Sequence, residues 1–291
     1  MNLFIFGLGF SAGYFAAHRI AHGDHVGGTV RTREKAARLS AQSIAAHVFG
    51  PEGRDSAIDA ALEACDALLI SVPPGLSGDP VLAAYGPRIA AAPNLRWIGY
   101  LSTIGVYGDH GGAWVDEQTP ATPTNARSIE RAEAEQAWLA FGAQHNIAVQ
   151  VFRLAGIYGP GRNQLAQLAN GTAKRIVKPG QVFNRIHVED IARVLDAALA
   201  RPRAGAIYNV ADNEPAPAQD VVAYAAQLCG LTPPPEIALD DAGLTGMARS
   251  FYAENKRARN DLLRTELGVT LAYPTYREGL RALRAAGEGP R

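Results

Sequence analysis

The chain has 291 residues, of which 47% are hydrophobic and 19% charged, so it can fill the core of one large α/β domain or two modest ones. This balance excludes disorder, and 28 basic against 28 acidic residues leave no net charge for binding a nucleic acid or an anionic membrane. Cys65 and Cys229 lie far apart in the sequence and match no metal spacing, which predicts a reduced, cytoplasmic protein without a bound metal.

The amino-terminal 17 residues are largely apolar, but they carry no basic start and are interrupted by glycines before His18 and Arg19 close the run. This run is too short to span a bilayer, and we expect it to belong to the fold rather than to a signal sequence.

Short apolar runs alternate with helical stretches, a pattern typical of a parallel sheet with crossover helices. Strands are predicted over residues 3–6, 25–31, 45–49, 67–72, 97–102 and 148–154, and helices over 12–21, 33–39, 56–64 and 127–144. Residues 183–187, 190–200 and 206–210 return to the same pattern, and the rest of the carboxyl part is mainly helical.

The predicted fold class is therefore α/β, a Rossmann-type doubly wound parallel sheet with a smaller, mainly helical C-terminal substrate lobe. Residues 1–155 plus 183–210 would form the dinucleotide-binding domain, and residues 156–182 plus 211–291 the substrate-binding lobe.

A glycine-rich turn follows the first strand and opens the first helix. Gly7, Gly9 and Ala12 give the G-x-G-x-x-A form of the dinucleotide fingerprint, in which backbone N–H groups at the start of a helix bind a pyrophosphate. Phe10 and Ser11 lie within the same turn and are expected to adjoin the cofactor. The same turn also reads G-x-S-x-G, the nucleophile elbow of hydrolases, but only one strand precedes Ser11 and none is left to supply the oxyanion loop.

The residues at the end of the second strand indicate which dinucleotide the site would bind. An NAD site would place a carboxylate there for the ribose 2′-hydroxyl, whereas this chain has Arg31 and Arg33, whose guanidinium groups suit a 2′-phosphate. NADP is the predicted cofactor, with NAD as the alternative. Ser71, Val72 and Pro73, at the end of the fourth strand, would line the adenosine side.

Three sequence blocks in order resemble the extended short-chain dehydrogenase/reductase family, of the NAD(P)-dependent epimerase/dehydratase type. They are residues 101–108 (LSTIGVYG), 153–161 (RLAGIYGPG) and 185–192 (RIHVEDIA). The resemblance covers nearly the whole chain, and it implies a Rossmann fold, a nicotinamide cofactor and often a nucleotide-sugar substrate.

The catalytic residues that this resemblance implies are only partly present. Thr103 matches the family's Ser/Thr, but Arg127 and Arg131 occupy the positions of its Tyr-x-x-x-Lys pair, as in atypical members of the family. Arginine stays protonated and cannot pass a proton, so Arg127 would act as an electrostatic clamp and Arg131 would hold a ribose or a phosphate. A Tyr-x-x-x-Lys does occur at Tyr252 and Lys256, outside the expected helix.

Three residues after the sixth strand are expected to adjoin the substrate: Tyr158, Arg162 and Asn163. His187 is expected at a strand–helix junction, with Asp190 helping to cap the helix.

The sequence thus favours an NAD(P)-dependent oxidoreductase, epimerase or dehydratase acting on a hydroxyl or keto group, as a monomer or a homodimer. The alternative is a non-catalytic NADP-binding regulatory protein that has lost the proton relay.

Overall fold

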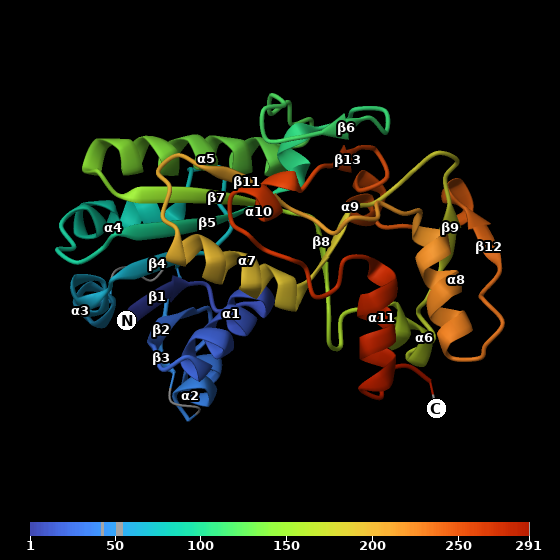
Figure 1. Ribbon diagram of the computed structural model, residues 1–291, viewed down its shortest axis with the longest axis horizontal. Helices are drawn as coiled ribbons and strands as arrows, with labels where there is room; N and C mark the ends of the chain where they lie inside the picture. Colours follow the sequence, from blue (N-terminus) through green and yellow to red (C-terminus); the bar gives the residue numbers. More distant parts are fainter. Residues whose placement is uncertain (42–43, 51–54, 291) are drawn as a thin grey trace.

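The computed structural model describes residues 1–41, 44–50 and 55–290. Within these ranges seven parallel strands form the central sheet, in the spatial order β11-β7-β5-β4-β1-β2-β3 (Figure 1). These strands are β1 (Asn2–Phe6), β2 (His25–Val30), β3 (Ala45–Val48), β4 (Ala67–Ile70), β5 (Trp97–Thr103), β7 (Ala148–Leu154) and β11 (Ile207–Val210). The order reverses between β1 and β4, and ligands bind at such a reversal, beyond the carboxyl ends of the strands. The predicted Rossmann-type fold is confirmed.

Helices cover both faces of the sheet, because alternate residues of a buried strand must find apolar neighbours on opposite sides. Leu3 and Ile5 of β1 belong to one core, and Phe4 and Phe6 to the other. The first core is covered by α1 (Phe10–Ala21), α2 (Arg33–Ser40) and α7 (Val188–Ala200). The second is covered by α3 (Ser56–Ala64), α4 (Pro80–Ala90) and α5 (Ala126–His145).

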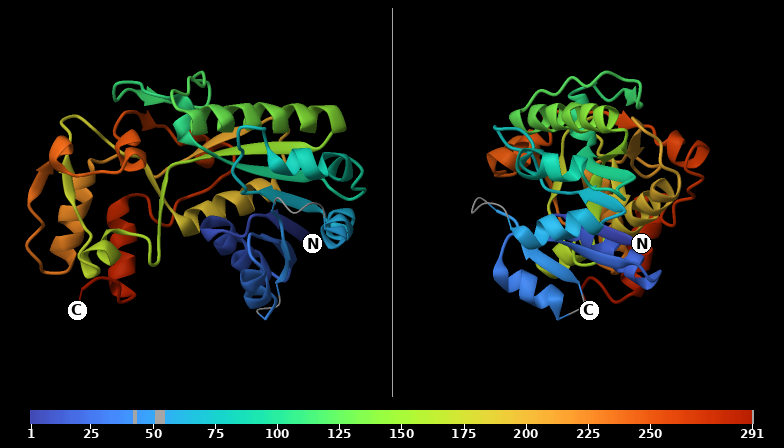
Figure 2. Two further views of the ribbon diagram at one scale, coloured as in Figure 1. Left: turned by 180° about the vertical axis from the view of Figure 1, so that it is seen from behind. Right: turned by 90° about the vertical axis from the view of Figure 1, so that its left-hand side faces the viewer.

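A second, smaller body lies at the end of the molecule away from the N-terminus (Figures 1 and 2). It contains α6 (Gln164–Ala169), α8 (Ala218–Leu228), α11 (Tyr276–Ala285) and the paired strands β9 (Arg175–Val177) and β12 (Glu236–Ala238). Its core is formed by side chains of the three helices together with Tyr158 and Ala216.

Short elements connect the two bodies. Strand β8 (Gly156–Tyr158) pairs with β10 (Arg185–His187), and β6 (Trp114–Val115) pairs with β13 (Arg257–Ala258). The remaining elements are η1 (Ile104–Tyr107), η2 (Leu239–Asp241), α9 (Gly246–Ser250) and α10 (Asp261–Thr265). Leu263 of α10 packs into the core of the central sheet, so part of the carboxyl-terminal chain returns to the main body.

The structure corrects three expectations. Helix α4 was not predicted, and residues 183–187, expected to continue the alternating pattern, contain a strand that pairs with β8 instead of joining the central sheet. Asp190 does not cap α7: His187 is the N-cap, its Nδ1 accepting the Glu189 N–H at 3.3 Å. The Asp190 carboxylate instead accepts hydrogen bonds from the N–H groups of Ala272 and Tyr273 at 2.7 and 3.0 Å. These bonds hold the segment that precedes α11 against α7.

None of the helices in the described ranges has both the length and the apolar character needed to cross a bilayer. Nor do the residues described there bring three or more His, Cys, Asp or Glu side chains together as a metal site.

Candidate cofactor site

The glycine turn between β1 and α1 is held in shape by the neighbouring strand β2. The Gly7 N–H donates to Thr29 Oγ1 at 2.9 Å, and the Leu8 N–H donates to the Thr29 carbonyl at 2.8 Å. Gly7 has φ +92°, a conformation that side chains rarely adopt, and a Cβ on it would lie 3.1 Å from the carbonyl carbon of Ser71. The turn therefore requires glycine on two grounds, backbone conformation and space.

Helix α1 begins at this turn without an internal cap. Its N-cap is Gly9, no described side chain accepts from its first N–H groups, and its first turn has no acidic residue. By contrast, Thr32 caps α2 and Asp79 caps α4 through their side chains. The first N–H groups of α1, together with the positive end of the helix dipole, are thus available for an external anion.

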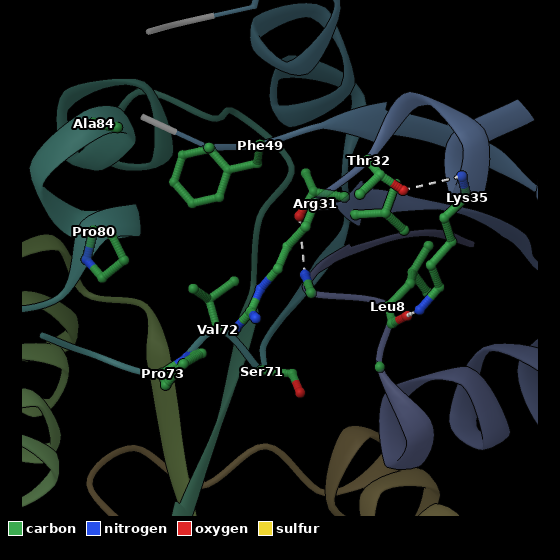
Figure 3. A pocket seen from close by; sticks show the side chains of 15 residues that line it. Leu8, Arg31, Thr32, Lys35, Phe49, Ser71, Val72, Pro73, Pro80 and Ala84 are labelled. Atoms are coloured by element: carbon green, nitrogen blue, oxygen red, sulfur yellow. Dashed lines mark hydrogen bonds between the residues drawn. The ribbon is translucent and has the colours of Figure 1, made fainter. Parts of the chain in front are cut away.

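A cavity of about 940 Å³ opens beside this turn, at the carboxyl ends of β1, β2 and β4 (Figure 3). It is lined by Gly7, Leu8, Gly9, Thr29, Val30, Arg31, Thr32, Lys35, Phe49, Gly50, Ser71, Val72, Pro73, Pro80 and Ala84. Of the residues predicted to hold a dinucleotide, the cavity brings together Gly7, Gly9, Arg31 and the 71–73 segment. Phe10, Ser11, Ala12 and Arg33 lie outside its lining, Ser11 and Ala12 being buried beneath the turn and Arg33 exposed on α2.

Two cations and no carboxylate stand among the described residues that line the cavity. The Arg31 side chain extends into the cavity toward Ser71 and Val72 (Figure 3). Lys35 lies in the first turn of α2, and its Nζ donates to the Leu8 carbonyl at 2.7 Å. Lys35 was not among the residues predicted to hold the cofactor, because its contact with Leu8 forms only when α2 folds over the turn. This end of the cavity therefore suits a ligand with negative charge near the end of β2.

The end of β5 holds Thr103 in a capping role. Thr103 Oγ1 accepts the Gly105 N–H at 3.1 Å and thereby caps η1. Next to it, Ser102 Oγ donates to Glu135, and Arg153 Nη2 donates to the other oxygen of Glu135 at 2.8 Å. All three side chains are buried, so this network holds Ser102, the residue before Thr103, in place.

Neither arginine of α5 lines the cavity. Arg127 is exposed in the first turn of the helix. Arg131 donates to the Leu101 carbonyl, and its guanidinium carbon lies 5.9 Å from the centre of the Tyr100 ring. Both contacts tie Arg131 to β5.

The Tyr252–Lys256 segment lies in a loop, so these two side chains do not share a helix face as the family's pair does. Lys256 Nζ donates to the Gly108 carbonyl and, at 2.7 Å, to Glu254. Burial raises the pKa of Tyr252, the direction opposite to that needed for proton transfer near neutral pH.

The three residues expected near the substrate are arranged differently from one another. Tyr158 is buried against α11, with its hydroxyl 3.5 Å from the Thr275 carbonyl, and burial raises its pKa. Asn163 is also buried: it caps α6, and its amide nitrogen donates to Gly159 and Glu288. Both side chains are occupied by the protein itself, and neither lines the cavity. Arg162 alone is exposed, over the ring of Phe10.

Comparison with known proteins identifies the family of the chain. Residues 89–211 match the model of the NAD dependent epimerase/dehydratase family. Protein YeeZ of Escherichia coli K12 is 34% identical over 246 residues, covering 79% of this chain and 84% of YeeZ. A solved structure of a functionally unknown conserved protein from Silicibacter pomeroyi is 52% identical, with a TM-score of 0.90 over 98% of this chain and 99% of that one. The chain belongs to the NAD-dependent epimerase/dehydratase family.

A more distant structure shows the fold alone. The dTDP-glucose 4,6-dehydratase of Bacillus anthracis, solved in complex with NAD, is 18% identical, with a TM-score of 0.76 over 99% of this chain and 97% of that one. The description of the family is NAD dependent epimerase/dehydratase, and the distant structure adds the fold.

Proposed function

We propose that this chain is an NADP-binding reductase, epimerase or dehydratase that acts on a hydroxyl or keto group of a small molecule. The observation that carries the proposal is the uncapped start of α1 beside a cavity whose described lining residues include the cations Arg31 and Lys35 and no carboxylate. The N–H groups of α1 suit the pyrophosphate, and the two cations favour a 2′-phosphate over a bare ribose hydroxyl.

Gly7, Gly9 and the first turn of α1 would hold the pyrophosphate, Arg31 and Lys35 the 2′-phosphate, and residues 71–73 the adenosine. The nicotinamide, when bound, accepts or donates a hydride. Phe10 and Ser11 would contribute backbone N–H groups, and Ala12 would keep α1 close to β1. Arg33 is farther from the cavity and would add positive charge at a distance.

Thr103 would orient the reacting hydroxyl or carbonyl of the substrate, since it ends β5, the strand next to β4, directly after Ser102, whose hydroxyl donates to the buried Glu135. Residues 156–182 and 211–291 would supply the rest of the substrate site. A nucleotide-sugar is one candidate substrate, because a protein of the same fold is a dTDP-glucose 4,6-dehydratase. The proton donor stays unassigned.

A second candidate is an NADP-binding regulator without turnover. It is favoured by the arginines at the positions of the family's Tyr and Lys and by the hydrogen bond that draws Arg131 to the Leu101 carbonyl. A guanidinium group in place of the tyrosine hydroxyl is a poor proton shuttle.

The test has two stages. Titration with NADPH and NADH, followed by fluorescence, measures binding, and we expect NADPH to bind more tightly. A screen of keto-sugars and aldehydes with NADPH then measures oxidation of the coenzyme. Turnover supports the enzyme, binding without turnover across the screen supports the regulator, and no binding of either coenzyme contradicts both.

A further inference from the structure

Arg162 is an exposed cation from the second body that reaches the start of α1. Its guanidinium carbon lies 5.6 Å from the centre of the Phe10 ring, and Phe10 is the first residue of α1. No carboxylate of the described residues lies within ion-pair distance of this guanidinium. An unpaired cation therefore stands over the one turn of the cofactor site whose N–H groups lack a cap.

The turn that carries Arg162 is rigid. Gly159 and Arg162 exchange backbone hydrogen bonds of 3.1 and 3.0 Å around Pro160 and Gly161, and Gly161 has φ +69°. Proline followed by a residue of positive φ is the arrangement of a type II turn. This turn is also pressed against the fold, since a Cβ on Gly159 would lie 2.6 Å from the Val188 side chain and 3.5 Å from the Phe10 ring.

The carboxyl-terminal segment fastens this turn. Glu288 accepts the Gly161 N–H at 2.9 Å through one oxygen and the Asn163 amide at 2.6 Å through the other. Arg284 donates to the carbonyls of Glu288 and Pro290 at 3.0 and 2.9 Å, which holds the segment in place. Both oxygens of Glu288 are thus used on the backbone and amide of the turn, and the Arg162 guanidinium is left free.

We propose that Arg162 is a phosphate-binding arm: when a dinucleotide is bound, its guanidinium leaves the Phe10 ring and pairs with pyrophosphate oxygens at the start of α1. The idea rests on the proposed function and adds a contact from the second body, so that the cofactor is held between the two bodies. The arm moves by side-chain torsions alone, because its backbone is fixed by the turn and by Glu288.

The test compares two ligands that share the 2′-phosphate and differ by the 5′-pyrophosphate with its terminal ribose. Arg162→Gln should weaken 2′-phospho-ADP-ribose by about tenfold, the size of one charge-assisted hydrogen bond at an exposed site, and leave adenosine 2′-monophosphate unchanged. Arg31→Gln should weaken both ligands, since both carry the 2′-phosphate. Arg162→Lys, which keeps the charge and loses the fork, should fall between Gln and the parent.

Arg259→Gln is the matched control, because Arg259 is also an exposed arginine over an aromatic ring, 5.7 Å from the centre of Trp114, and should change neither affinity. Thermal melting without ligand checks that each variant is folded. Equal affinity of Arg162→Gln and the parent for 2′-phospho-ADP-ribose would overturn the proposal, and so would an equal loss for both ligands. If the parent binds neither ligand, the proposed function itself fails.

Discussion

Replacing Glu135 by glutamine should destabilise the protein strongly, because it leaves a charged arginine without its counter-ion in the core. The side chains of Glu135 and Arg153 are 1% and 4% exposed and their N–O distance is 2.8 Å. Burial by itself would lower the pKa of Arg153, but the hydrogen bonds to Glu135 and its negative charge more than offset this effect. The pKa of Arg153 is therefore raised, and its guanidinium stays charged. Breaking a buried pair by removing one partner costs 3–5 kcal/mol, and since glutamine can still accept one hydrogen bond we expect about 3 kcal/mol.

Urea unfolding, followed by the fluorescence of the buried Trp97 and Trp138, measures this loss. Glu236→Gln is the control: Glu236 meets Arg175 at the same 2.8 Å, but its side chain is 60% exposed. Such a surface pair is worth about 0–1 kcal/mol. If the two substitutions lower the free energy of unfolding by the same amount, burial does not give the Glu135–Arg153 pair its importance, and the inference that this pair holds Ser102 at the end of β5 is wrong.

Three further predictions concern the turn and two buried groups. Gly7→Ala should lower the free energy of unfolding by about 1–3 kcal/mol and abolish coenzyme binding, because the new Cβ meets Ser71 and the residue has a positive φ. Gly13→Ala is the control and should do neither, because its Cβ would meet nothing within 4 Å. Thermal melting and coenzyme titration of both variants decide this. Burial lowers the pKa of His187 to about 4, so as the pH falls below 6.5 the unfolded chain binds a proton before the folded protein does, and the parent loses stability. His187→Asn keeps an N-cap, and at pH 5 it should escape roughly 2 kcal/mol of the loss that the parent shows. Parallel acid unfolding curves of parent and variant would contradict this. Burial raises the pKa of Asp212 to about 8, so the parent loses stability as the pH rises from about 4 to 8. In urea unfolding, Asp212→Asn should reduce this dependence of stability on pH. An unchanged dependence would show that Asp212 is ionised in the folded protein.

The central sheet could be predicted from sequence because its strands are buried apolar runs separated by helices. Helix α4 was missed since Gly86 and Pro87 interrupt it, although Asp79 and Pro80 form a regular helix start. Strands of two or three residues, such as β6 and β9, carry no readable period and depend on partners distant in the chain.

The site was predictable where its parts are adjacent in sequence, as in the glycine turn and Arg31. Lys35 was missed because its contact with Leu8 exists only once α2 folds back over the turn. The burial of Tyr158 and Asn163 follows from α11 and the carboxyl-terminal segment, which are more than 100 residues away in the chain.

The ratio of the dissociation constants for NADP and NAD, measured by calorimetry on the parent and on a variant with both Arg31 and Lys35 changed to glutamine, tests the assignment of the cavity most directly. We predict that the parent favours NADP by at least about tenfold and that the double variant loses this preference while still binding NAD. Equal affinities in the parent, or a preference that survives the double substitution, would contradict it.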